Sequence, residues 1–262
     1  MLQILRTFFP AILATSALSA SVDPLEDSIV GQSTYPYRLF VPANGETPLP
    51  LIVYLAGLGE KGTDNTLQVQ RHIQPLLDIT QSPESPYAAI VLAPQSQSGW
   101  WDGDSVNALV DEIERSYAID PYRTYITGMS AGGGGCYVTL ASRPNRWAAA
   151  LPLSAVRDAD AISKITNIPI WMIHGTADEI VPSSASQQVY DELVLLGSTP
   201  RLTLIDKWDH NNWAKVYADN KSYTQSYEGG TPKNALTGIY PWLFSHSTAP
   251  STRNSLSKEK VD

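Results

Sequence analysis

Short apolar runs rich in β-branched residues alternate along the chain with segments in which apolar residues recur at helical spacing. The apolar runs predict strands over residues 35–41, 49–55, 88–92, 124–127, 148–153, 170–174 and 202–205. The amphipathic segments between them predict helices over residues 65–77, 105–117, 132–142 and 184–196. Continuous apolar strands separated by helices are typical of a mostly parallel sheet covered on both faces. The pattern therefore predicts an α/β fold, whose ligands bind at the carboxyl ends of the strands.

The helix expected over residues 105–117 shows this spacing most clearly. Its apolar positions, three and four residues apart, are Val106, Leu109, Val110 and Ile113. Asp104 stands just before the first of them and is the expected N-cap, because its side chain can accept a hydrogen bond from a backbone N–H of the first turn.

The two ends of the chain differ from the region between them. Residues 1–20, MLQILRTFFPAILATSALSA, have one positive charge at Arg6, an apolar centre and a small-residue end. This layout predicts a secretory signal peptide, cleaved between Ser19 and Val22, and thus a secreted or periplasmic protein with no stable membrane insertion after cleavage. A buried N-terminal helix is the alternative, which Pro10 disfavours. Residues 21–245 form the expected α/β domain, and the aperiodic segment 246–262 is expected to be a disordered tail.

Length, charge and cysteine content narrow the class of protein. A chain of 262 residues can bury a sizeable core. The formal net charge of −8 argues against a nucleic-acid partner, which requires a basic face. Cys136 is the only cysteine, so no intramolecular disulfide can form. Nothing in the composition specifies an oligomeric state.

One serine lies in a context that predicts chemistry. The run YITGMSAGGGGC contains Gly-x-Ser-x-Gly over residues 128–132, between an expected strand and an expected helix. This motif places its serine on a sharp strand-to-helix turn, with the hydroxyl exposed at the top of the sheet and at the positive end of the helix. Ser130 is therefore the candidate nucleophile.

Three further glycines, Gly133, Gly134 and Gly135, exceed what this turn requires. We expect them to let the helix pack closely against the central sheet. A phosphate-binding loop is the alternative, but the run lacks the Gly-Lys-Ser/Thr ending of a P-loop.

A serine hydroxyl needs a neighbouring base, normally a histidine that is oriented by a carboxylate. Among the four histidines, His246 falls in the expected tail, His72 in an early helix and His174 at the end of a strand, where a structural role is expected. His210 lies on the loop after the last expected strand, in LIDKWDHNNW, and is the candidate base. Asp178, in HGTADEIVP directly after a strand, is the candidate carboxylate. Its rivals are Glu179, Asp206 and Asp209.

An oxyanion that forms on the substrate needs preorganised N–H donors. The candidate donors are the backbone amides of Ala131 and of Leu58, which lies in the glycine-containing loop LAGLGEKGTDN. The expected substrate contacts are Gly57, Gln95, Trp100 and Trp101. The two tryptophans could stack on a sugar ring or a phenolic acyl group, or they could close their loop as core residues.

With these motifs in place, the chain resembles an α/β-hydrolase. It is similar to exported esterases related to polyhydroxybutyrate depolymerases and to the neighbouring group of predicted peptidases. The matching segments span about residues 35–244 and are LAGLGEKGTDN, LAPQSQSGWWDG, YITGMSAGGGG, IHGTADEIVP and WDHNNW. Relatives usually carry His-Gly at Ala56–Gly57 and commonly glycine at Ala131, and both changes retain the backbone amides.

The resemblance implies the α/β-hydrolase fold, no metal and no organic cofactor. It also implies a serine esterase that acts through an acyl-enzyme intermediate on a small-molecule or polymer-linked ester. The substrates expected for an exported enzyme with exposed aromatics are carbohydrate- or polymer-linked short acyl or phenolic esters. A serine peptidase of the same fold is one alternative, and a non-catalytic hydrolase-like binding protein is another.

Overall fold

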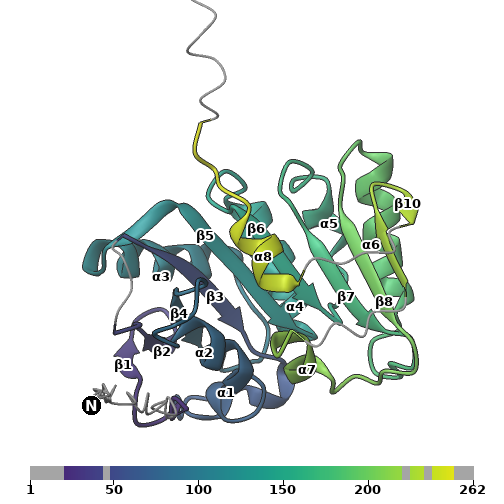
Figure 1. Ribbon diagram of the computed structural model, residues 1–262. Helices are drawn as coiled ribbons and strands as arrows, with labels where there is room; N and C mark the ends of the chain where they lie inside the picture. Colours follow the sequence, from purple (N-terminus) through teal and green to yellow (C-terminus); the bar gives the residue numbers. More distant parts are fainter. Residues whose placement is uncertain (1–20, 44–47, 220–224, 233–237, 251–262) are drawn as a thin grey trace, which may run out of the picture.

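A computed structural model of the chain describes residues 21–43, 48–219, 225–232 and 238–250 (Figure 1). The expected signal peptide, residues 1–20, lies outside the described residues.

The centre of the molecule is a single sheet with strand order β1-β2-β4-β3-β5-β6-β7-β8-β9-β10. The strands are β1 (Ile29–Gln32), β2 (Pro36–Phe40), β3 (Leu49–Leu55), β4 (Ile90–Pro94), β5 (Ile119–Met129), β6 (Ala149–Leu153), β7 (Trp171–Gly175), β8 (Arg201–Ile205), β9 (Gln225–Glu228) and β10 (Thr231–Pro232). The inner run from β4 to β8 is parallel, and the outer strands at both edges pair antiparallel. The predicted α/β fold with a mostly parallel sheet is therefore confirmed.

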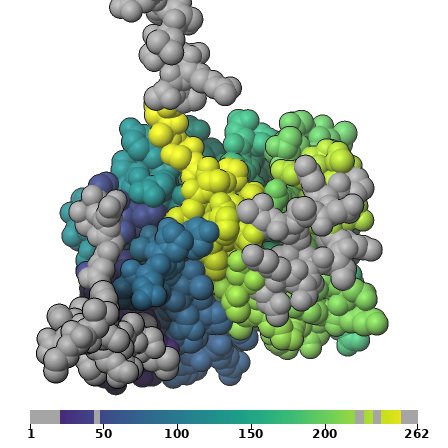
Figure 2. Space-filling model, in the orientation of Figure 1, coloured from purple at the N-terminus to yellow at the C-terminus, as the bar shows by residue number. Residues whose placement is uncertain are grey.

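Helices cover both faces of this sheet (Figure 1). They are α1 (Leu67–Gln70), α2 (Gln74–Thr80), α3 (Gly103–Ser116), α4 (Ala131–Ser142), α5 (Ala159–Ile162), α6 (Ser184–Leu195), α7 (Trp213–Tyr217) and α8 (Ile239–Phe244). Strand side chains alternate between two cores: Leu51 and Val53 pack with α3 to α6, whereas Ile52 and Tyr54 pack with α1, α2, α7 and α8. Figure 2 shows α8, in yellow, lying across the second of these faces.

Two local predictions about helices were wrong. The single helix expected over residues 65–77 is divided into α1 and α2, because Pro75, in the first turn of α2, has no N–H to donate to the carbonyl of Arg71 and so cannot continue α1. The N-cap of α3 is Asp102 and not Asp104: its side chain accepts from the backbone N–H of Ser105 at 2.8 Å. The helix therefore begins two residues earlier than its apolar spacing indicates.

The glycine run forms the first turns of α4 and packs closely, but mostly against the segment after β6 and Trp101 and not, as expected, against the sheet itself. A Cβ at Gly133 would lie 2.7 Å from the Cβ of Ala155, and one at Gly134 would lie 2.9 Å from the carbonyl oxygen of Val156. A Cβ at Gly135 would lie 2.6 Å from the Trp101 ring. These glycines let α4 approach its neighbours more closely than any other residue would allow.

The start of the expected C-terminal tail contacts the sheet. The carbonyl of His246 accepts a hydrogen bond from the Tyr125 hydroxyl at 2.9 Å, and the Thr248 amide donates to the carbonyl of Tyr122 at 3.0 Å. Residues 246–250 therefore pack at the amino-terminal part of β5, and the remainder of the expected tail, residues 251–262, lies outside the described residues.

Candidate active site

The segments that follow the parallel strands carry the candidate residues. Ser130 directly follows β5, Asp178 follows β7 and His210 follows β8. Residues 56–61, which follow β3, are called the 56–61 loop below. Because β3 pairs parallel with β5, and β7 with β8, all of these segments emerge at the carboxyl edge of the sheet.

Ser130 occupies a strained turn between β5 and α4. Its backbone has φ 56° and ψ −118°, a conformation that L-residues adopt rarely. The turn is possible because glycines flank it: a Cβ at Gly128 would collide with the carbonyl of Gly132, and one at Gly132 with the carbonyl of Leu55. The Ser130 amide donates to Leu153 of β6 at 2.9 Å, which ties the turn to the sheet. The hydroxyl is thereby held above the strand ends.

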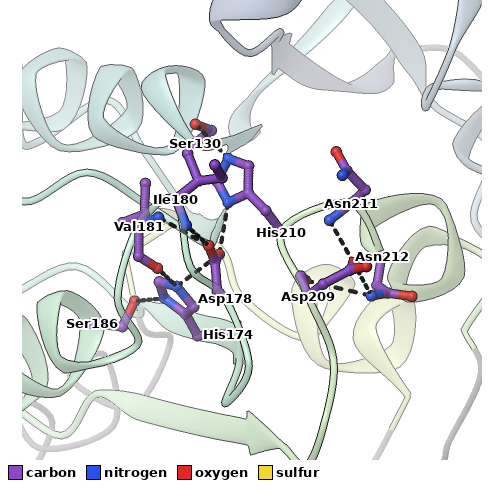
Figure 3. Close-up of polar contacts among 10 residues, drawn as sticks. All are labelled: Ser130, His174, Asp178, Ile180, Val181, Ser186, Asp209, His210, Asn211 and Asn212. Atoms are coloured by element: carbon purple, nitrogen blue, oxygen red, sulfur yellow. Dashed lines mark hydrogen bonds and ion pairs between the residues drawn. The ribbon is translucent and has the colours of Figure 1, made fainter.

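The three candidate side chains form one hydrogen-bonded chain (Figure 3). Nε2 of His210 lies 3.0 Å from Oγ of Ser130, and its Nδ1 lies 2.7 Å from Oδ2 of Asp178. Ser130 is 8% exposed and His210 is 9% exposed, so the chain is largely withdrawn from water. The structure therefore brings together the serine, histidine and aspartate that the sequence singles out.

The carboxylate of Asp178 has a full set of donors. Its Oδ1 accepts from the backbone N–H groups of Ile180 at 3.0 Å and Val181 at 2.9 Å. Burial by itself raises the pKa of Asp178, but the hydrogen bonds from His210 and Val181 outweigh it, so the pKa lies below its ordinary value. Asp178 is therefore ionised at neutral pH and able to orient His210.

The rival carboxylate, Asp209, is engaged elsewhere. Its Oδ1 accepts from the Asn211 amide at 2.9 Å and from Nδ2 of Asn212 at 2.6 Å (Figure 3). This hydrogen bonding stabilises the turn that carries His210, and it directs the Asp209 side chain away from the imidazole.

His174 is a structural residue at a strand end, as the sequence indicates, but it also contacts the candidate site. It is buried, with Nδ1 2.7 Å from Oγ of Ser186 and Nε2 2.8 Å from the carbonyl oxygen of Val181. Nε2 also lies 3.2 Å from Oδ2 of Asp178. A carbonyl can only accept, so Nε2 carries the proton and Nδ1 accepts from Ser186. Burial lowers the pKa of His174 despite the nearby Asp178 carboxylate, which keeps the ring neutral.

The two predicted oxyanion donors are the first residues of helical turns. Ala131 is the first residue of α4, and Leu58 is the first residue of a 3-10 turn over Leu58–Glu60. The first N–H groups of a helical turn have no partner within that turn, which makes them natural donors to an oxyanion. Both predicted donors thus lie at suitable positions in the backbone.

The 56–61 loop is held by two side-chain contacts. Oε2 of Glu60 accepts from the Gly57 amide at 2.8 Å, and Nε1 of Trp101 donates to the Ala56 carbonyl at 3.2 Å. These contacts support the loop from two sides. The role of Glu60 was not foreseen from the sequence. A carboxylate between Gly59 and Lys61 in a glycine-containing loop is normally expected to be exposed.

The expected substrate contacts divide into two groups. Gln95 is fully buried, and its side chain accepts from the Asn65 amide at 2.6 Å and donates to Oδ1 of Asp64 at 2.9 Å, so it supports its loop. The Gly57 amide is engaged by Glu60. Trp101 is half-buried against Gly135, whereas Trp100 is 56% exposed.

A cavity of about 210 Å³, called the Ala131 pocket below, adjoins the candidate oxyanion donor. Its lining is mostly apolar, with two charged residues, and consists of Trp100, Trp101, Ala131, Gly134, Gly135, Val138, Val156, Arg157 and Asp158. The two tryptophans also line a wider groove of about 830 Å³, whose other walls include the neutral side chains of Gln32, Thr34, Thr63 and Gln97. Trp100 and Trp101 therefore line both the Ala131 pocket and the wider groove.

The part of the chain that the structure describes has neither a metal-binding cluster nor a membrane-spanning helix. No group of three or more histidine, cysteine and carboxylate side chains is arranged to hold a metal ion there. None of the described helices is long and apolar enough to cross a membrane. Cys136 is buried, and burial raises the pKa of its thiol, so it serves packing.

The sheet order, the serine turn and the position of the hydrogen-bonded side chains together define an α/β-hydrolase fold. A structure described as a thermostable esterase superposes with a TM-score of 0.69 at 28% identity, covering 86% of this chain and 64% of that one. The structure of esterase PE8 superposes with a TM-score of 0.54 at 19% identity, covering 69% of this chain and 94% of that one, and supports the fold alone.

Sequence comparison identifies esterase-like relatives. A bifunctional acetylxylan esterase/xylanase of Neocallimastix patriciarum is 26% identical over 152 residues, which cover 55% of this chain and 21% of that protein. Poly(3-hydroxyalkanoate) depolymerase C of Paucimonas lemoignei is 34% identical over 82 residues, covering 24% of this chain and 20% of that protein. The matches thus span about a fifth of each curated relative. No family model matches the chain. The predicted resemblance to α/β-hydrolase esterases is confirmed.

Proposed function

We propose that the protein is a serine hydrolase that cleaves carboxylic esters through an acyl-enzyme intermediate. The observation that carries the proposal is the continuous hydrogen-bonded chain from Ser130 through His210 to Asp178. The esterase-like relatives favour an ester as the bond that is cleaved.

In the first half of the reaction, Oγ of Ser130 attacks the ester carbonyl carbon while its proton passes to Nε2 of His210. The ionised Asp178 stabilises the resulting imidazolium and holds it in the orientation set by the Nδ1 hydrogen bond. The carbonyl electrons move to oxygen, where the N–H groups of Leu58 and Ala131 stabilise the negative charge. When the intermediate collapses, the imidazolium gives its proton to the departing alcohol, and the acyl group remains on Ser130.

In the second half, a water molecule loses a proton to Nε2 of His210 and attacks the acyl carbon. The same two backbone amides stabilise the second oxyanion. Collapse of this intermediate breaks the bond to Ser130, which recovers its proton from His210, and the carboxylic acid is released.

The volume of the Ala131 pocket supports an upper limit on the size of the acyl group. An apolar cavity of about 150 Å³ holds benzene in a protein interior, so a pocket of about 210 Å³ accepts one aromatic ring or a short aliphatic chain. The wider groove beyond Trp100 and Trp101 is lined largely by neutral polar groups, which suits a carbohydrate or another polymer that carries the ester. The substrate class we propose is therefore a short acyl or phenolic ester of a polymer, acted on outside the cytoplasm.

Hydrolysis of p-nitrophenyl acetate by the purified chain tests the reaction. Ser130→Ala should reduce the rate by at least about 10⁴-fold, because the nucleophile is lost. It should also abolish labelling by a fluorophosphonate probe. Ser116→Ala changes an exposed serine on α3 and is the matched control, with the parent's rate and labelling. Equal rates for Ser130→Ala and the parent would refute the proposal, and a matched amide substrate shows whether the chain is a peptidase instead.

A further inference from the structure

Glu60 is a buried carboxyl group inside the 56–61 loop. It is only 3% exposed, although Leu58 in the same turn is 43% exposed. Its Oε2 accepts from the Gly57 amide at 2.8 Å, and its own amide donates to the Gly57 carbonyl at 3.1 Å. The side chain of Glu60 therefore holds the N–H of the Ala56–Gly57 peptide, and its backbone holds the carbonyl of the Gly57–Leu58 peptide, so that Gly57 is fixed from both sides.

The second carboxyl oxygen of Glu60 lies near His72, which packs on Trp213 next to His210. Oε1 has no hydrogen-bond partner among the described residues, and it lies 3.6 Å from Nε2 of His72. The His72 ring meets the edge of the Trp213 ring at a centroid distance of 5.0 Å, and Trp213 meets His210 in the same manner at 4.8 Å. Glu60 thus stands between the 56–61 loop and the packing that positions His210.

This placement is costly for a carboxyl group. Burial raises the pKa of Glu60 to about 7, against the lowering effects of the Gly57 hydrogen bond and of Arg71. The other titratable groups that face it are His72, Tyr54 and Tyr217. A folded protein is often at least as stable when an apolar side chain of similar size replaces a buried charged group. The geometry therefore indicates a purpose other than stability.

We propose that Glu60 is a positioning residue: its side chain holds the Ala56–Gly57 peptide and thereby fixes the backbone at Gly57 in the conformation that points the next amide, the Leu58 N–H, at the developing oxyanion. The inference rests on the proposed ester hydrolysis for its kinetic consequence. It assigns to Glu60 the support of the loop, together with the contact from Trp101 to the Ala56 carbonyl. Without this support, the loop retains its glycines but loses the contact that selects one orientation of the peptide.

Two variants of similar size separate hydrogen bonding from packing. Glu60→Gln keeps an oxygen that can accept from the Gly57 amide, whereas Glu60→Met keeps the volume and removes the acceptor. We expect Glu60→Met to lower kcat on p-nitrophenyl acetate by about 10- to 100-fold with little change in KM, because the lost interaction acts only in the transition state. Glu60→Gln should restore kcat to within about threefold of the parent. Melting temperatures measured on the same samples report whether each variant is folded.

Equal kcat values for the parent and Glu60→Met would overturn the proposal, as would an equal loss in both variants. A second measurement does not depend on turnover: the NMR resonance of the Gly57 amide proton. In the parent it should shift through a titration with a midpoint near pH 7, which Glu60→Gln should abolish. A pH-independent Gly57 resonance in the parent would overturn the assignment of Glu60. An inactive parent with a titrating Gly57 resonance would refute ester hydrolysis and leave the contact established.

Discussion

Nε2 of His174 lies 3.2 Å from the same Asp178 oxygen, Oδ2, that accepts from Nδ1 of His210 at 2.7 Å. One carboxylate oxygen is therefore approached by two imidazoles, one from the end of β7 and one from the loop after β8. Because Nε2 of His174 also donates to the Val181 carbonyl, the neutral ring links Asp178 to the loop that follows it. The orientation of Asp178 thus depends on a histidine that makes no contact with Ser130.

The buried state of His174 predicts how stability depends on pH. Burial holds the pKa of His174 below the ordinary value of about 6.5 in the folded chain, whereas the unfolded chain has that ordinary value. The unfolded chain therefore takes up the proton first as pH falls, and folding loses stability from about pH 6.5 downward to the lowered pKa. His174→Gln removes the titrating group and retains hydrogen-bonding capacity. We expect the fall in melting temperature between pH 7 and pH 5 to be smaller in this variant than in the parent. Calorimetry at the two pH values measures this difference. A fall of the same size in both would contradict this account.

The close packing of α4 predicts a cost for larger residues in the glycine run. In Gly134→Val, the new Cβ would lie 2.9 Å from the Val156 carbonyl oxygen, so the backbone has to move. Overpacking of this kind costs about 1–3 kcal/mol, which corresponds to a fall of roughly 3–10 °C in melting temperature for a chain of this size. Thermal unfolding followed by circular dichroism measures this change. Ala108→Val, at an exposed position of α3, is the matched control and should change the melting temperature by only about 1 °C. An unchanged melting temperature for Gly134→Val would exclude the packing explanation.

The Ala131 pocket predicts a selective effect on the acyl group. Trp100 forms one wall of the pocket and is also exposed to solvent, so Trp100→Ala should weaken contact with a large acyl group more than with acetyl. Loss of an aromatic contact worth about 1.5 kcal/mol would lower the ratio of kcat/KM for p-nitrophenyl benzoate to that for the acetate by about tenfold.

A comparison with another exposed aromatic makes this test specific. Tyr122 lies near the amino-terminal end of β5, at the opposite end of that strand from Ser130, and Tyr122→Ala should leave the ratio unchanged. If Trp100→Ala also leaves the benzoate-to-acetate ratio unchanged, Trp100 does not form part of the acyl site.

The sequence predicted those features that depend on local pattern. Seven apolar runs correspond to strands, and the Gly-x-Ser-x-Gly motif places Ser130 between β5 and α4 as expected. The prediction was weaker where the pattern is short: β1, β9, β10, α5, α7 and α8 were not foreseen. Pro75 illustrates the remaining error, since the periodic apolar pattern continues across the break between α1 and α2 that this proline, in the first turn of α2, requires.

What the sequence determined by itself is the order of the main strands and helices and the chemical groups at the strand ends, because periodicity and turn residues act over a few neighbouring positions. Tertiary structure alone decided which of these groups meet. Ser130 and His210 are 80 positions apart and touch only because β5 and β8 run parallel within one sheet. The same holds for Glu60, His72 and Trp213, whose contacts arise from the packing of separate segments. No local pattern specifies such contacts, since they depend on where the fold brings distant segments together.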